Sequence, residues 1–134
     1  MKTRILGITA AGLMMAAVPM LAHHSFSAEY DRSKPITVKG TVTKVEWMNP
    51  HARFYVDVKD DSGVVTNWEF ELGSPNGLMR EGWSRNSLKE GDVVTVSGSR
   101  AKDGANLVNA QSVAFEDGKR VLGAASSAQS PATQ

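Results

Sequence analysis

The sequence contains no cysteine among its 134 residues. This absence excludes disulfides, thiolate metal sites and cysteine nucleophiles. The chain also lacks an excess of charge of either sign, because 15 basic residues accompany 14 acidic ones, for a net charge of +1. Without a basic field the protein has no general attraction for nucleic acid, so we expect no nucleic-acid partner. The length and the hydrophobic fraction of 41% predict one globular domain.

Residues 1–22 have the layout of a secretory signal peptide. Lys2 and Arg4 form a short basic region, an apolar run rich in small residues follows, and Pro19 interrupts that run before Ala22. The run is too short and too interrupted to favour a spanning helix, although an uncleaved membrane anchor is the alternative. We therefore expect a periplasmic protein that has no stable membrane insertion after cleavage.

The position of the cut decides how the mature chain begins. Cleavage after Ala22 makes His23 the first residue, and Pro19 is well placed for that cut. Met20, however, then occupies a position where a small residue is preferred. Cleavage after Ala17 is the alternative.

Period-two alternation of apolar and polar residues predicts strands in the first half of the domain. A long strand covers residues 36–47, and its apolar phase slips between Val42 and Val45, which predicts a β-bulge. Residues 53–58 and 64–72 alternate on either side of a polar turn and predict a hairpin.

The second half begins with a break in the alternation. Ser74 or Asn76 caps a short helix in this stretch, and we expect Leu78 and Met79 to point inward from it. A turn rich in polar residues and glycine then leads into a second predicted hairpin, formed by residues 93–100 and 107–115.

This order of elements predicts an all-β fold with one short helix. Five strands with a helix between the third and the fourth are typical of a small OB-like Greek-key barrel, which we place at residues 35–122. A split β-sandwich or another small barrel is the alternative. Residues 23–34 form an N-terminal segment, and residues 123–134 lack apolar periodicity and predict a disordered tail.

The aromatic residues divide into core and surface by their phase on the strands. Phe54, Trp68 and Phe70 fall on the apolar phase, which predicts burial. Trp47 and Tyr55 are the exposed candidates, so a stacking platform for single-stranded nucleic acid or sugars is a weaker reading than a core.

The loop of the predicted barrel mouth, "WMNPH", and the adjacent strand supply a candidate ligand-binding surface. We expect it to comprise Trp47, Asn49, Arg53 and Tyr55.

Two acidic residues lie two positions apart on one strand. Glu69 and Glu71 share a face, and Arg53 is placed to meet them across the hairpin. A solvated face with cross-strand ion pairs is favoured over a catalytic pair of carboxylates.

Three stretches together resemble a known family. They are "HHSFSAEYD" after the signal peptide, "GTVTKVEWMNPHARFYVDV" and "GDVVTVSGSRAKDGANL". Proteins of the family that they resemble are small exported bacterial proteins of unknown function. Their mature part begins with a His-His-Ser-Phe run, and they carry a central Asn-Pro-His. The resemblance implies export and a shared design, and it supplies no mechanism.

The chain has three histidines, and they are its candidate metal ligands. If His23 begins the mature chain, its amine and ring nitrogen can chelate one ion, and His51 is the better third ligand. His24 is accessory, because adjacent side chains of an extended segment point to opposite sides. Copper(II) favours such nitrogen sites, and zinc is the alternative ion. The competing interpretation is that the histidines are only polar residues at the end of the export signal and in a loop, without a metal.

The function predicted from these observations is a periplasmic binding protein that is not an enzyme. It binds copper through the mature N-terminal histidine and the loop histidine, and its partner is an unidentified protein or a metal-handling protein. The alternative is a protein- or small-ligand-binding OB-like module without metal, and a copper enzyme is the third reading.

Overall fold

The computed structural model describes residues 28–118 and 121–123. The predicted signal peptide, His23, His24 and residues 124–134 lie outside the described residues. The described elements, in chain order, are β1 (Tyr30–Glu46), β2 (Arg53–Lys59), β3 (Val65–Glu71), α2 (Pro75–Arg80), β4 (Val93–Ala101), β5 (Leu107–Phe115) and β6 (Val121–Gly123).

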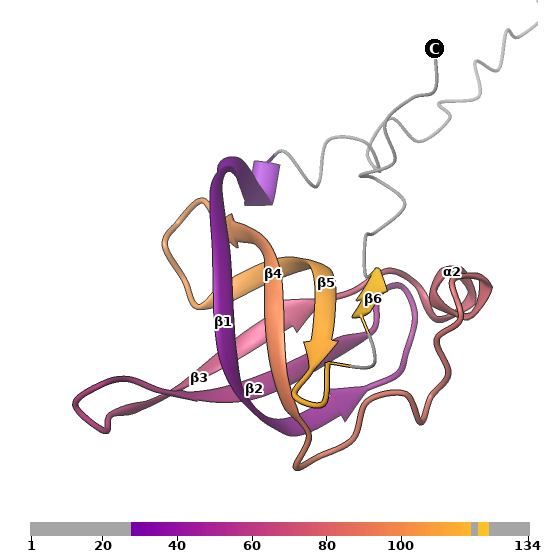
Figure 1. Ribbon diagram of the computed structural model, residues 1–134. Coiled ribbons are helices and arrows are strands. Elements are labelled where there is room, and N and C mark those ends of the chain that lie inside the picture. Colours follow the sequence, from indigo (N-terminus) through magenta and orange to yellow (C-terminus); the bar gives the residue numbers. More distant parts are fainter. Residues whose placement is uncertain (1–27, 119–120, 124–134) are drawn as a thin grey trace, which may run out of the picture.

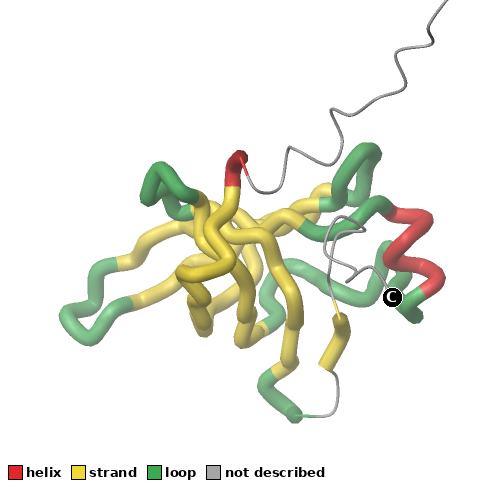
Figure 2. Tube along the Cα trace, turned by 90° about the horizontal axis from the view of Figure 1, so that it is seen from above, coloured by secondary structure: helices red, strands yellow, loops and turns green. Residues whose placement is uncertain are grey.

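The strands form one sheet in the order β3-β2-β1-β4-β5-β6, and β3 also pairs with β5. That additional pairing is parallel and short, and it completes a ring of five paired strands. Figure 2 shows the strands gathered around a common centre, with α2 to one side. The predicted class, mostly β with one short helix between the third and fourth strands, is confirmed for the described part of the chain.

The predicted slip in the first strand is confirmed as an irregularity in its register. β1 pairs with β4 through its first half and with β2 through its second half, and the β1–β2 register shifts between Val42 and Lys44. The long strand therefore serves two neighbours in succession, which requires the bend that a bulge supplies. The predicted hairpin between β2 and β3 is also confirmed, and it projects away from the other strands (Figure 1).

Two ends of the strand set differ from the prediction. β1 begins at Tyr30, inside the predicted N-terminal segment. A sixth strand, β6, pairs with residues 112–114 of β5 and includes Gly123, which the prediction assigns to the tail. Three residues are too few for the alternation of side chains to be recognised in a sequence.

The core lies inside the ring and follows the predicted alternation. Phe54 and Phe70 are fully buried, and their rings stack with centroids 5.0 Å apart. The predicted inward phase of β2 and β3 is thus confirmed, although Trp68 is only half-buried. The fully buried aliphatic residues around the two rings include Val42, Val56, Leu72, Leu78, Val94, Val96, Val108 and Val113.

Helix α2 is capped as the sequence predicts. The Gly77 backbone N–H donates to the Ser74 hydroxyl over 3.2 Å, so Ser74 is the N-cap. Leu78 is buried, whereas Met79 is 51% exposed. The prediction that both point inward is therefore wrong for Met79, because the helix has six residues and only one narrow side faces the core. No helix of the described residues is long and apolar enough to cross a membrane.

Two glycines allow strands to approach closely where the ring bends. A Cβ atom at Gly98 would overlap the carbonyl oxygen of Asn109, and one at Gly40 would overlap that of Asp57. Only glycine avoids these overlaps, which explains why β1 and β4 each carry one on the bent part of the strand.

Candidate functional site

His51 lies just before β2, in a position that continues the β2–β3 hairpin. The backbone of Ala52 donates to the Gly73 carbonyl over 3.0 Å and accepts from the Leu72 N–H over 2.8 Å. These bonds hold the backbone beside His51 against the end of β3. Its side chain remains 36% exposed, so the ring is anchored on one side and open on the other.

The ring of His51 has one nitrogen engaged by the backbone. Its Nδ1 lies 3.0 Å from the carbonyl oxygen of Leu72. Because a carbonyl only accepts, Nδ1 carries the hydrogen and donates it. In the neutral ring Nε2 then keeps its lone pair, and this is the arrangement that orients histidine ligands in metal sites.

A buried carboxylate lies behind His51. Glu71 is only 8% exposed, and its Oε2 accepts from the Tyr30 hydroxyl over 3.0 Å and from Arg53 Nη2 over 3.2 Å. Its Oε1 is 3.9 Å from Nδ1 of His51. Arg53 also pairs with Glu69 through its Nη1 atom. We call Tyr30, His51, Arg53, Glu69 and Glu71 the Glu71 cluster.

The predicted pairing of Arg53 with Glu69 and Glu71 is confirmed by these ion pairs. The prediction of a solvated face is wrong for Glu71. The first residue of β1, Tyr30, is 2% exposed and places its hydroxyl on the Glu71 carboxylate, which covers it from water. A buried charge needs such partners, and here the donors come from β1 and β2.

The cluster changes the acidity of its neighbours. Burial, and next the negative charge of Glu71, raise the pKa of the Tyr30 phenol above its ordinary value. The same two causes, in the same order, raise the pKa of the Glu29 carboxyl. Tyr30 therefore acts as a hydrogen-bond donor throughout the physiological pH range.

The other predicted ligand-binding residues are brought together only in part. The Tyr55 hydroxyl donates to Glu46 Oε2 over 3.3 Å, and because Tyr55 pairs with Glu69 and Glu46 pairs with Arg53, this bond borders the Glu71 cluster. Asn49 is exposed. Trp47 is not the open aromatic surface that we expect, because it is half-buried and packs against the core. Of these four, only Arg53 lies in the Glu71 cluster.

The Tyr55 hydroxyl belongs to a small group at the border of the Glu71 cluster. Lys44 Nζ is 2.5 Å from Glu46 Oε1 and 5.4 Å from the centre of the Tyr55 ring. The hydrogen bond from Lys44 is the main cause that holds the pKa of Glu46 below its ordinary value. The group is a surface ion pair beside an aromatic ring.

Sequence reasoning missed Tyr30 and the central role of Glu71. Tyr30 stands in a polar stretch, "SAEYDRSK", with no apolar alternation to mark a strand. The signal in the sequence that could indicate the start of the strand is one aromatic residue, Tyr30, followed by Pro35 and the alternating residues of β1. Such a signal locates a strand start but does not identify its partner 41 residues away.

Of the three predicted histidine ligands, the structure describes one. His51 is placed, whereas His23 and His24 lie outside the described residues. Within residues 28–118 and 121–123, no group of three or more His, Asp or Glu side chains lies close enough to hold a metal ion. A metal site that includes His51 therefore needs ligands from elsewhere, and the N-terminal histidines are suitable by type.

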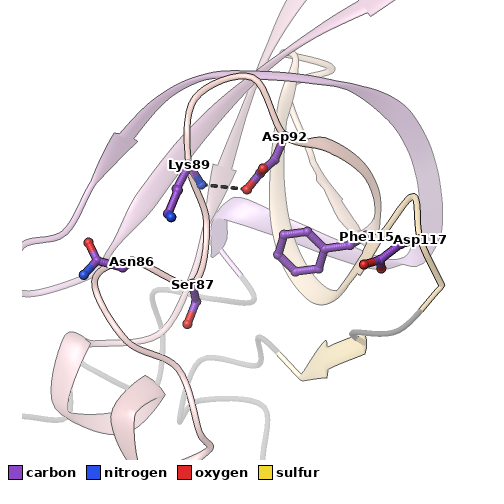
Figure 3. Close-up of a pocket in the computed structure, with 6 residues that line it drawn as sticks. All are labelled: Asn86, Ser87, Lys89, Asp92, Phe115 and Asp117. Carbon is purple, nitrogen blue, oxygen red and sulfur yellow. Dashed lines mark hydrogen bonds between the residues drawn. The ribbon is translucent and has the colours of Figure 1, made fainter.

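The described residues line several cavities, among them one at the end of β5 and one beside the start of β1, and neither of these two is lined by His51. The first, of about 220 Å³, is lined by Asn86, Ser87, Lys89, Asp92, Phe115 and Asp117. We call it the opposite pocket, because Phe115 is at the other end of β5 from the part that pairs with Glu71. Figure 3 shows Lys89 and Asp92 on one turn and Phe115 and Asp117 at the end of β5. Since Glu71 pairs with Asn109, Phe115 lies roughly 20 Å farther along β5 from the Glu71 cluster.

The second cavity lies beside the start of β1, since Glu29 and Ala101 line it and Tyr30 pairs with Ala101. It measures about 490 Å³ and is lined by Ala28, Glu29, Ala101, Lys102, Asp103 and Leu107. We call it the N-terminal groove.

Comparison with known proteins identifies a family but no function. Residues 10–109 match the model of a family of unknown function, DUF6152. No curated protein and no solved structure matches the chain.

Proposed function

We propose that this chain, which belongs to the family of unknown function DUF6152, is an exported periplasmic protein. We further propose that it binds copper(II) through His23, His24 and His51. The single observation that carries the proposal is the orientation of the His51 ring. With Nδ1 donating to the Leu72 carbonyl, Nε2 is the ring nitrogen left to bind a metal, on a side chain that is 36% exposed.

The start of β1 lies close to this ligand. The Tyr30 hydroxyl is 3.0 Å from Glu71 Oε2, and His51 Nδ1 is 3.9 Å from Oε1 of the same carboxylate. His24 is only four residues before Ala28 in the chain, a span of at most about 14 Å. The chain length therefore permits the N-terminal histidines to reach the open side of His51.

The choice of copper follows from the donor types. The chain offers imidazole nitrogen and no thiolate, and an amine joins them if cleavage after Ala22 makes His23 the first residue. Nitrogen donors of this kind favour copper(II), while zinc is the alternative ion. The basic region and apolar run of residues 1–22 support export.

The scaffold of the proposed site is an OB-like Greek-key barrel. The closed set of pairings β1–β2–β3–β5–β4–β1 and the position of α2 between β3 and β4 support this assignment. In such a barrel the loop between β1 and β2, which carries His51, borders the usual ligand surface.

The test begins with the exported protein, purified from the periplasm with its own signal. Its intact mass before and after one equivalent of copper(II) reports both the first residue and the retained metal. A chain that starts at His23 and keeps one copper ion against a mild chelator is the expected result. Copper lost to the chelator would contradict the proposal.

Variants then assign the ligands. His51→Ala and one residue inserted before His23 are each expected to weaken copper binding at least about tenfold. Asn49→Ala is the matched control, because Asn49 is exposed in the same loop and is not a proposed ligand. Copper binding that both histidine changes leave unaltered would contradict this ligand set. Loss of copper retention in the wild-type protein would favour the metal-free alternative, a protein- or small-ligand-binding module whose binding is sensitive to Trp47→Ala or Tyr55→Ala.

A further inference from the structure

The apolar part of the N-terminal groove is formed by Ala28, Ala101 and Leu107. Ala101 and Leu107 also pack with Tyr30 in a small apolar cluster that is separate from the main core. Leu107 itself is only partly buried, so one side of its side chain faces the groove. Apolar surface of this kind is stabilised when another apolar side chain covers it.

One wall of the groove is a turn that its own hydrogen bonds hold in place. Arg100 donates to the carbonyl oxygens of Gly104 and Ala105 over 2.7 and 3.2 Å, and the Ala105 N–H donates to Asp103 Oδ1 over 2.9 Å. The turn between β4 and β5 therefore offers a preformed surface, which lowers the entropic cost of docking a segment against it.

The opposite wall is the start of the described chain. The Lys102 N–H donates to the Glu29 carbonyl over 2.9 Å, and Tyr30 pairs with Ala101. Figure 1 shows this start of the chain beside the turn between β4 and β5. Ala28, to which the preceding residues are bonded, therefore lies at the edge of the groove.

Residues 23–27 contain one side chain suited to the apolar part of the groove. Between His23 and Glu29, Phe26 is the only large apolar residue. It stands two residues before Ala28, which lines the groove, so the chain limits the distance between the two Cα atoms to about 7 Å. An aromatic ring of this size gains substantially from burial, and the cavity of about 490 Å³ has room for it.

We propose that Phe26 docks in the N-terminal groove against Leu107 and Ala101. The docked ring fixes the segment that carries His23 and His24 beside Glu29, whose carboxyl senses the charges of Glu71 and Arg53. The docking itself stands on the groove, and its consequence for metal binding rests on the proposed function. Docking would prepare the two N-terminal histidines to meet His51 and so strengthen copper binding.

The first measurement uses metal-free exported protein with labelled leucine and alanine methyl groups. Nuclear Overhauser contacts from the Phe26 ring to the methyl groups of Leu107 and Ala101 are expected, and Phe26→Ala removes them. Ser25→Ala is the matched control and leaves them unchanged. Absence of these contacts in the wild-type protein would overturn the docking, as would contacts that arise only between two molecules in an isotope-mixed sample.

The second measurement separates this inference from the proposed function. Phe26→Ala is expected to weaken copper binding about five- to tenfold, while Phe26→Leu retains most of the affinity. Ring contacts in a protein that retains no copper would support the docking and refute the copper role. Tight copper binding without ring contacts would support the copper role and refute the docking.

Discussion

The Glu71 cluster and the opposite pocket hold their carboxylates in different ways. Glu71 is buried and receives hydrogen bonds from side chains of β1 and β2. Asp92 lies at an open pocket and receives the Lys89 backbone N–H over 2.8 Å within a single turn (Figure 3). The buried carboxylate depends on three strands being in place together, whereas the turn carboxylate depends only on its neighbours in the chain.

The largest expected effect is the loss of the buried carboxylate. Glu71→Ala removes the carboxylate that accepts from the Tyr30 hydroxyl and one of the two carboxylates that pair with Arg53. We expect the free energy of unfolding to fall by about 3 kcal/mol. Urea denaturation measures it, and Glu71→Gln, which keeps an acceptor for Tyr30, should lose less. Equal losses in the two variants would show that the neutral acceptor kept by glutamine contributes nothing and that the loss comes from the missing charge.

Removal of one donor to Glu71 has a smaller expected effect. Tyr30→Phe deletes the hydroxyl and keeps the ring that packs on Ala101, so the free energy of unfolding should fall by about 1 kcal/mol. Tyr55→Phe is the matched control, because its hydroxyl donates to Glu46 beside an exposed lysine. A loss in Tyr55→Phe as large as in Tyr30→Phe would remove the distinction between buried and exposed acceptors.

The opposite pocket provides the next prediction. Asp92→Ala removes the acceptor of the Lys89 N–H, and that N–H is exposed, so water can replace the lost bond. We expect a loss of about 0.5 kcal/mol in the free energy of unfolding, well below that of Glu71→Ala. A cost comparable with that of Glu71→Ala would mean that the two carboxylates stabilise the fold to a similar extent.

The smallest expected effect depends on pH. The pKa of Glu29 is raised above 4.5, mainly by burial, so its ionised form lowers the stability of the folded state at neutral pH. Glu29→Gln should therefore raise the free energy of unfolding at pH 7 by less than about 0.5 kcal/mol, because solvent screens this exposed group.

The difference in the free energy of unfolding between the wild-type protein and Glu29→Gln should disappear at low pH. As the pH falls through the raised pKa, Glu29 takes up a proton in the folded state, and below about pH 4 it is mostly protonated in both states. Thermal melts of the two proteins between pH 4 and pH 7 measure the effect. A stability gap that widens towards low pH has the wrong sign for a raised pKa.

The sequence predicts the features of the fold that depend on neighbours in the chain. The alternation in β2 and β3, the slip near Val42 and the Ser74 cap each follow from a few consecutive residues. The pairing of Arg53 with Glu69 and Glu71 also follows, because a hairpin fixes which residues face each other.

The features that the sequence does not predict depend on distant parts of the chain. The burial of Glu71 requires Tyr30 to reach it from β1, and no local pattern encodes that contact. The pattern also marks Trp47 as exposed, although it packs on the core. Whether the histidines form a metal site stays a prediction, since His23 and His24 lie outside the described residues.

The parallel pairing of β3 with β5 has a consequence for how the protein folds. It joins three residue pairs, Glu69 with Leu107, Phe70 with Val108 and Glu71 with Asn109, across the intervening α2 and β4. Contacts between such distant residues are slow to form, whereas the β2–β3 hairpin closes locally. We expect this seam to close after the folding barrier. A ligand that links the N-terminal segment to His51 would then stabilise this late contact. It would slow unfolding without accelerating folding.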